Sequence, residues 1–162
     1  MRQNHLLPAV LTALVACACA DKGPWPEVTV FENYSTGVPY RIPALDMTRS
    51  GDIVALADYR YCHSDIGFGP IDLHCSISGD LGRSWSAPFT MAAGDSTLAG
   101  GWNYAFGDPS IVADSDSDEI LALSCGGHIV FWDSTRERPQ DCVRHRSHDG
   151  GRTYQTMLNV FA

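Results

Sequence analysis

The chain has 162 residues and a formal net charge of −8 at pH 7. Phosphate binding needs clustered Lys and Arg side chains, and the 11 basic residues here are scattered, so the composition argues against a nucleic-acid partner. The 15 glycines, 9 prolines and many short β-rich runs, without a long segment of helical periodicity, argue against a helical fold. The sequence therefore predicts an all-β protein.

The first 20 residues have the pattern of an export leader. A positively charged start is followed by an apolar run too short to span a bilayer. Residues 14–17 resemble the lipobox of bacterial lipoproteins, in which Cys17 carries the lipid, whereas residues 18–20 fit ordinary cleavage by signal peptidase. We expect an exported bacterial protein that is periplasmic, outer-membrane-anchored or secreted. It would contact a membrane only through a lipid at Cys17, and residues 21–27 are expected to be a linker.

Export makes disulfides possible, because thiols can pair in oxidising compartments. Four cysteines remain outside the leader, and four cysteines allow three connectivities, among which the sequence does not choose. Neighbouring Cys and His residues suggest a zinc site, but no Cys-x-x-Cys pair accompanies them and adjacent residues do not easily share one tetrahedral ion. We expect neither a metal site nor a cofactor. The four cysteines are Cys62, Cys75, Cys125 and Cys142.

Two stretches, residues 78–85 and 147–154, share the pattern Ser-x-Asp-x-Gly-Arg-Ser/Thr-aromatic. In each copy the Ser and Asp side chains can accept hydrogen bonds from turn amides, the Gly permits a positive φ, and the aromatic residue can pack under the turn. The pattern predicts two hairpin turns closed by their own side chains. Two unrelated turns would explain one copy, but they explain two aligned units poorly.

The repeat extends upstream of both turns. An apolar hairpin is predicted over residues 43–57 and again over 109–124, with a third strand at 71–77 and at 143–146, and a fourth strand after each turn. Four antiparallel strands per unit form the blade of a β-propeller. Residues 28–162 are therefore expected to form about two blades.

Tyr40-Arg41-Ile42-Pro43 precedes the first turn, and with this element the chain resembles the exo-sialidases, six-bladed propellers that remove terminal sialic acid. The strand that ends in Arg60, the loop with Asp65 and the two Ser-x-Asp turns, which match the Asp-box repeats of that family, complete the resemblance. It implies an all-β six-bladed β-propeller of the sialidase type, of which this chain covers about the first two blades. It also implies hydrolysis of α-linked sialic acid from glycoproteins, glycolipids or oligosaccharides, with retention of configuration.

The resemblance assigns roles to four residues. Arg41 matches the first arginine of a three-arginine cluster that binds the substrate carboxylate, which a guanidinium can hold bidentately. Arg60 matches a second site arginine, at the carboxylate or the O4 region of the sugar. Asp65 matches the acid/base catalyst, which protonates the leaving oxygen and then activates water. Asp108 matches a residue that faces the N-acetyl or glycerol region.

The residues themselves leave alternatives beside these roles. Arg41 lies in an otherwise apolar strand, so we expect it to be poorly placed for solvent. Asp72 competes with Asp65, but it alternates with apolar neighbours on a predicted strand, whereas Asp65 lies in a Gly-rich loop suited to project over a ligand. Arg60 could also be an ordinary arginine at a strand end, and Gly-Asp-Pro at Asp108 is equally a common turn.

Aromatic clusters at residues 102–104 and 131–132 could line an N-acetyl pocket, but blade core is the favoured interpretation. In the family, the nucleophilic Tyr, its Glu and the other site arginines come from later blades. The chain ends at Ala162 within an expected fourth strand, which predicts an N-terminal fragment that is inactive and poorly folded by itself. The alternatives are a non-catalytic glycan-binding propeller, which does not need Asp65, and a protein-interaction propeller, which needs neither Arg41 nor Asp65.

Overall fold

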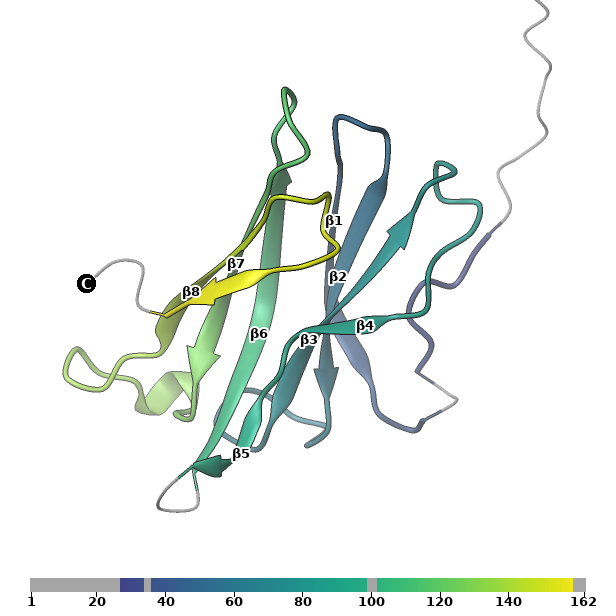
Figure 1. Cartoon of the computed structure of the whole chain (residues 1–162). Coiled ribbons are helices and arrows are strands. Elements are labelled where there is room, and N and C mark those ends of the chain that lie inside the picture. The colour runs from purple at the N-terminus through teal and green to yellow at the C-terminus, as the bar shows by residue number, and fades with distance from the viewer. Residues whose placement is uncertain (1–26, 34–35, 99–101, 159–162) are drawn as a thin grey trace, which may run out of the picture.

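The structure, a computed structural model, describes residues 27–33, 36–98 and 102–158. The expected leader, nearly all of the expected linker and the last four residues lie outside the described residues. The described part is all-β apart from one short 3-10 turn, η1 (Phe131–Asp133), and it forms two antiparallel sheets that lie side by side (Figure 1). No helix in these ranges is long and apolar enough to cross a membrane.

Each sheet contains the four strands that the repeat predicts, in sequential order, and the second sheet has one more. The first sheet comprises β1 (Tyr40–Met47), β2 (Ile53–Arg60), β3 (Ile71–Ser78) and β4 (Phe89–Ala92). The second comprises β5 (Asp95–Leu98), β6 (Trp102–Ala113), β7 (Ile120–Gly127), β8 (Asp141–Ser147) and β9 (Gln155–Met157). The sequence did not predict β5 or the first half of β6, because this Gly- and Ser-rich stretch has the composition of a loop.

Both sheets contain a β-bulge at the same place in the ladder. The residue that begins each bulge has a positive φ, 51° at Ile42 and 55° at Asp108, and a proline follows it. Proline has no amide hydrogen to give to the ladder, so the two residues leave the pairing and the strand bends there. The bulges lie between Arg41 and Ala44 in β1 and between Gly107 and Ser110 in β6.

The two Ser-x-Asp turns are closed by their own side chains, as predicted. In the first, the Asp80 carboxylate accepts hydrogen bonds from the Ser84 amide at 2.8 Å and the Ser84 hydroxyl at 2.7 Å. The Ser78 hydroxyl oxygen accepts the Gly82 amide at 2.8 Å. Hydrogen bonds from Ser84 lower the pKa of Asp80 to about 2. Asp149 makes the same bonds with Thr153 in the second turn.

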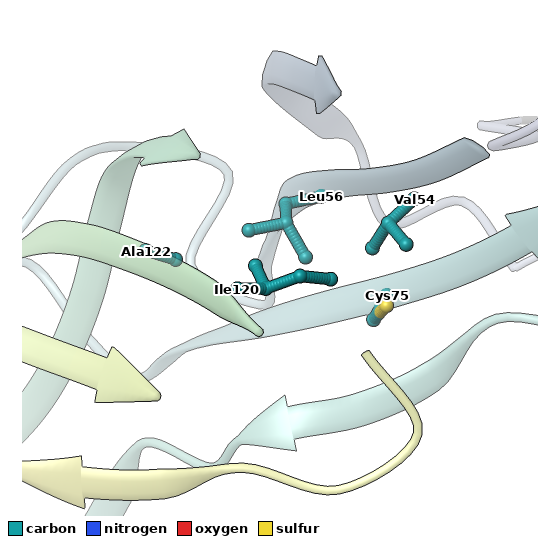
Figure 2. Packing of buried hydrophobic residues seen from close by; sticks show 5 residues of the cluster. All are labelled: Val54, Leu56, Cys75, Ile120 and Ala122. Atoms are coloured by element: carbon teal, nitrogen blue, oxygen red, sulfur yellow. The ribbon is translucent and has the colours of Figure 1, made fainter. Parts of the chain in front are cut away.

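The main core lies between the two sheets. Figure 2 shows side chains of β2 and β3 meeting those of β7, and these residues are 0 to 1% exposed: Val54, Leu56, Cys75, Ile120 and Ala122. Burying an aliphatic side chain of this size contributes roughly 1.5–3 kcal/mol. Polar contacts also join the sheets, because the Asp46 carboxylate accepts the Ala113 amide at 2.7 Å. The two sheets therefore form one packed unit.

Candidate functional site

The candidate site lies at the end of the sheets opposite the Ser-x-Asp turns. β2 ends there at Arg60 and continues into the irregular loop of residues 61–70, at the lower end of the molecule in Figure 1. Both β-bulges are close to this end, since Arg41 lies opposite Asp58 in the ladder. The predicted position of the Asp65 loop outside a regular strand is confirmed.

Arg60 is the centre of the site, and its side chain is only 3% exposed. Its Nε and Nη2 donate to the Asp58 carboxylate at 3.1 and 2.7 Å, and its Nη1 donates to the Ser64 carbonyl at 2.9 Å. The carboxylates of Asp65 and Asp108 lie 3.4 and 3.7 Å from the same guanidinium. The structure therefore brings together three of the four predicted site residues.

Asp58 is the site residue that the sequence reasoning missed. Its side chain is fully buried and holds Arg60 on one side, while its other oxygen accepts the Asp108 amide at 3.1 Å. Burial raises the pKa of Asp58 to about 6, although its hydrogen bond with Arg60 acts in the opposite direction. The available signal was the Asp-x-Arg spacing, because residues two apart on a strand point to the same face.

Gly107 allows the two sheets to approach each other at this point. A Cβ at Gly107 would lie 3.4 Å from the Asp58 carboxylate and 3.3 Å from the Ile66 side chain, so a larger residue would have to displace one of them. The Asp58 bond to the Asp108 amide thus spans the two sheets and holds the strained bulge of β6 in place.

Asp65 projects from a loop in which Ser64 accepts a hydrogen bond from Arg60 and the residues after Asp65 are packed. The adjacent Ile66 is 3% exposed and packs in a small core cluster, whereas the Asp65 side chain is 59% exposed. Gly67 has a φ of 94°, and a Cβ at this position would lie 2.5 Å from the Val130 amide nitrogen. The carboxyl group is therefore open to solvent while its loop rests on the second sheet.

Asp72 does not belong to the Arg60 cluster. It lies on β3, where its carboxylate accepts the Tyr61 hydroxyl at 2.9 Å and the Gly94 amide at 2.7 Å. Burial acts to raise its pKa, but hydrogen bonds from His74, Gly94 and Tyr61 outweigh burial and lower it. Asp72 is thus an ionised structural carboxylate, which suits it poorly to donate a proton.

Arg41 is exposed, so the expectation that it would be poorly placed for solvent was wrong. The reason is that β1 is an edge strand of the described sheet and bulges immediately after Arg41. Its side chain pairs with no residue in the described ranges, and it lines a cavity of about 190 Å³ with Tyr40 and Phe31. An unpaired guanidinium one strand away from Asp58 is available to an anionic ligand.

The turn alternative for Asp108 was also wrong, because the residue lies within β6 as part of the bulge. The core interpretation of Phe131 and Trp132 was wrong as well, since they are 78% and 71% exposed. They belong to η1, in a loop beyond the end of the sheet, where Trp132 approaches Phe68 with a ring distance of 6.0 Å. The side chains of residues 102 and 103 lie outside the described residues.

Among the described residues, no group of three or more His, Cys, Asp or Glu side chains is arranged to hold a metal ion. The Cys-His pairs at residues 62–63 and 74–75 lie in different places, the first in the Asp65 loop and the second on β3. The side chains that the candidate site itself contributes are the buried guanidinium of Arg60, the exposed carboxylates of Asp65 and Asp108, and the exposed guanidinium of Arg41.

Comparisons by sequence and by fold find similar proteins that share one name. No family model matches the chain. A sialidase of Bacteroides fragilis is 27% identical over 132 residues, and a sialidase of Micromonospora viridifaciens is 36% identical over 90 residues. The chain is thus similar in sequence to two sialidases.

Solved structures of sialidases have the same fold. The Hadza microbial sialidase Hz136 superposes with a TM-score of 0.60 and 25% identity over 74% of this chain. The NanB sialidase from Streptococcus pneumoniae superposes with a TM-score of 0.54 and 22% identity over 70% of this chain, which supports the fold alone. The sialidase-type propeller sheets predicted from the sequence are confirmed in this part of the fold.

The chain spans only part of these relatives. It covers 24% of the Bacteroides protein, 13% of the Micromonospora protein and 25% of the Hz136 chain. The similarity to sialidases therefore concerns two neighbouring sheets and about a quarter or less of the length of each of these relatives. Those sheets carry the Arg60 cluster at one end and the Ser-x-Asp turns at the other.

Proposed function

We propose that the protein is an exo-α-sialidase that hydrolyses terminal α-linked sialic acid from glycoproteins, glycolipids or oligosaccharides, with retention of configuration. The observation that carries this proposal is the meeting of Asp65 and Asp108 on the buried Arg60, with the exposed Arg41 on the neighbouring strand. The similarity to sialidases supports this reaction, and the site provides groups that suit it.

Recognition of the sugar begins with its carboxylate. Arg41 has its guanidinium exposed and unpaired among the described residues, so it can bind that carboxylate bidentately. Arg60 has three N–H groups committed to Asp58 and Ser64, and it directs the remaining two toward Asp65 and Asp108. Arg60 thus orients the two exposed carboxylates, and Asp108 hydrogen-bonds to the sugar.

The acid/base step belongs to Asp65. As a neutral acid it protonates the leaving glycosidic oxygen, and as a carboxylate it then removes a proton from the attacking water. Its 59% exposed side chain can reach a bound glycoside, whereas Asp58 is fully buried and Asp72 is held by Tyr61 and Gly94. A nucleophile is also required, and we propose a tyrosine outside the 162 residues, because a second carboxylate would be repelled by the substrate carboxylate.

A non-catalytic glycan-binding propeller is the second candidate, and the exposed Arg41 favours it equally, because binding a sialoside does not require Asp65. We further propose that residues 1–20 direct export and that Cys17 provides a lipid anchor if the lipobox is used. The enzyme and the glycan-binding module differ in one observable, because the enzyme releases free sialic acid and the binding module does not.

The test uses the product of the complete reading frame and its Asp65→Ala variant. Wild-type protein should release sialic acid from sialyllactose and from an aryl sialoside with an acidic phenol leaving group. Asp65→Ala should lose far more activity on sialyllactose than on the aryl sialoside, because an acidic leaving group needs little protonation. An equal loss on both substrates would refute the acid role of Asp65.

Binding without release by the wild-type protein would instead favour the glycan-binding candidate. Asp72→Ala is the matched control, since it removes a nearby carboxylate that lies outside the Arg60 cluster. Whatever activity this variant loses, it should lose to the same extent on both substrates.

A further inference from the structure

Cys125 and Cys142 form a pair that the proposed reaction does not use. They are directly opposite each other on the antiparallel strands β7 and β8. Directly opposite Cα atoms lie about 4.5 to 5.5 Å apart, which is within the roughly 4.4 to 6.8 Å that a disulfide spans. Both thiols are free and half-buried in this structure, and both line a cavity of about 340 Å³ that also contains Asp108.

The electrostatic surroundings of Cys125 are consistent with a position close to Cys142. Burial raises the pKa of the Cys125 thiol, and the nearby Asp108 carboxylate and the Cys142 sulfur raise it further. The other two cysteines are separated from each other. Cys75 is fully buried in the core between the sheets, with its sulfur 3.7 Å from the Gly151 carbonyl, whereas Cys62 follows the far end of β2.

The segment between the two cysteines supports the Asp65 loop. Residues 128–140 connect β7 to β8 and include η1. A Cβ at Gly67 would lie 2.5 Å from the Val130 amide nitrogen, and the Phe68 and Trp132 rings are 6.0 Å apart. The Asp65 loop therefore rests on this connection, and Cys125 and Cys142 lie at its two ends.

We propose that Cys125 and Cys142 are a disulfide-forming thiol pair that closes the base of the 128–140 connection and thereby steadies the support of the Asp65 loop. The inference rests on strand register and shared burial, so the existence of the crosslink does not depend on sialidase activity. Of the three connectivities that the sequence left open, two pair Cys125 with another cysteine and are excluded by this bond. The third contains it, but its second bond is not expected, because Cys62 and Cys75 are separated from each other.

The oxidant is a disulfide, either a small-molecule disulfide or that of an oxidising protein partner. One cysteine thiolate attacks a sulfur of this disulfide, forms a mixed disulfide and releases one thiol. The second cysteine thiolate then attacks the protein sulfur of the mixed disulfide and releases the second thiol. The protein loses two S–H bonds and gains one S–S bond, and the oxidant takes up the two electrons and two protons.

The first measurement is a peptide map of the native protein after incubation with oxidised glutathione. Trypsin cleaves between the two cysteines at Arg136, so Cys125 lies in peptide 84–136 and Cys142 in peptide 137–144, while Cys62 and Cys75 share peptide 61–83. After free thiols are alkylated, we expect 84–136 joined to 137–144, and separation of the two on reduction. A bond from Cys125 to Cys142 and a bond from Cys125 to either cysteine of peptide 61–83 give linked products of different mass.

The controls use serine variants. Cys142→Ser should abolish the linked product, and Cys62→Ser should retain it. Alkylation of both Cys125 and Cys142 in the oxidised, folded wild-type protein would overturn the proposal, and so would a link from 84–136 to 61–83. The map of the wild-type protein decides the matter even if a variant fails to fold.

The second measurement is hydrogen exchange of the same protein in its oxidised and reduced forms. Amides of residues 128–140 and 65–68 should exchange several-fold more slowly after oxidation, and amides of the Ser-x-Asp turns should not change. The crosslink should also raise the Tm by roughly 5 to 10 °C, because it closes a short loop in the unfolded chain. A crosslinked protein with unchanged exchange at 65–68 would refute the link to the Asp65 loop.

Discussion

At the scale of single residues, the two Ser-x-Asp turns differ in backbone strain at one equivalent position. Leu81 has a φ of 61° in the first turn, and the equivalent Gly150 has a φ of 70° in the second. A left-handed conformation costs a non-glycine residue roughly 1–2 kcal/mol, and glycine adopts it without that cost. The first turn therefore stores strain that the second turn avoids.

Leu81→Gly should stabilise the protein by roughly 0.5–1 kcal/mol, because relief of the strain exceeds the greater entropy of glycine in the unfolded chain. Gly150→Ala should destabilise it, since the new Cβ would also lie 2.7 Å from the Arg152 side chain. Urea unfolding of both variants measures the two changes. Destabilisation by Leu81→Gly would mean that the half-exposed leucine contributes packing greater than its strain.

Two ion pairs of equal length allow the effect of burial on the stability contributed by an ion pair to be measured. Arg60–Asp58 and Arg152–Asp52 both measure 2.7 Å, but the first is almost completely buried and the second is largely exposed on its arginine side. Removing one partner of a buried pair leaves an uncompensated charge and costs about 3–5 kcal/mol, whereas an exposed pair contributes about 0–1 kcal/mol.

Asp58→Asn should therefore lower the free energy of unfolding by about 3 kcal/mol, and Asp52→Asn by less than about 1 kcal/mol. Chemical denaturation at pH 7 and low salt provides the comparison. Similar losses in the two variants would show that Asp58 does not hold Arg60 in the way the structure indicates. Loss of activity that exceeds the loss of folded protein in Asp58→Asn would support its positioning role.

At the scale of elements, β8 carries a buried titratable group. His145 is fully buried, with Ser124 and Thr156 hydroxyls 2.9 Å from its two ring nitrogens. Burial lowers its pKa to about 4, below the ordinary value of about 6.5 in an unfolded chain. Between these values the unfolded state binds the proton more readily, so the stability that neutral His145 provides at pH 7 is lost as the pH falls from 6.5 toward 4.

His145→Gln should reveal this dependence. The difference in unfolding free energy between wild type and variant should shrink by on the order of 3 kcal/mol between pH 7 and pH 4. Wild type and variant must be compared at each pH, because Asp58 gives stability an opposite dependence on pH. The pKa of Asp58 is raised to about 6, so its contribution to stability falls as the pH rises from about 4 to 6. A difference that does not vary with pH would contradict the neutral, buried state of His145.

The strands that were predictable from sequence have an apolar face that packs in the core, and the strand that was missed does not. Alternating apolar residues and paired Ser-x-Asp turns fix β2, β3, β7 and β8, because a one-residue shift would expose their core faces. The polar β5 has no such face and was missed. The predicted burial of Arg41 and Phe131 was also wrong. Their exposure is set by the course of a β-bulge and of the β7–β8 connection at the end of the sheets, and the sequence pattern does not indicate that course.

At the scale of the whole molecule, the two ends of the paired sheets carry different features. The Ser-x-Asp turns and the inter-sheet core hold one end together, and the bulged strands carry the Arg60 cluster at the other. Asp58 was not predictable as a site residue from sequence alone, because its role requires the Asp108 amide from the neighbouring sheet. The position of Asp65 in an irregular loop was predictable from the Gly-rich composition around it, and its acid/base role stays a proposal.

The central claim is that this end of the molecule recognises the carboxylate of a sialic acid. The direct measurement is a titration of the complete protein with an unsaturated sialic-acid analogue and with the same analogue bearing a neutral amide in place of the carboxylate. Wild type should bind the carboxylate form much more tightly. Arg41→Ala should weaken its binding by roughly 2 to 4 kcal/mol and largely remove the preference, and Arg41→Lys should restore little, because an ammonium cannot form the bidentate pair. Undiminished preference in Arg41→Ala would contradict the claim.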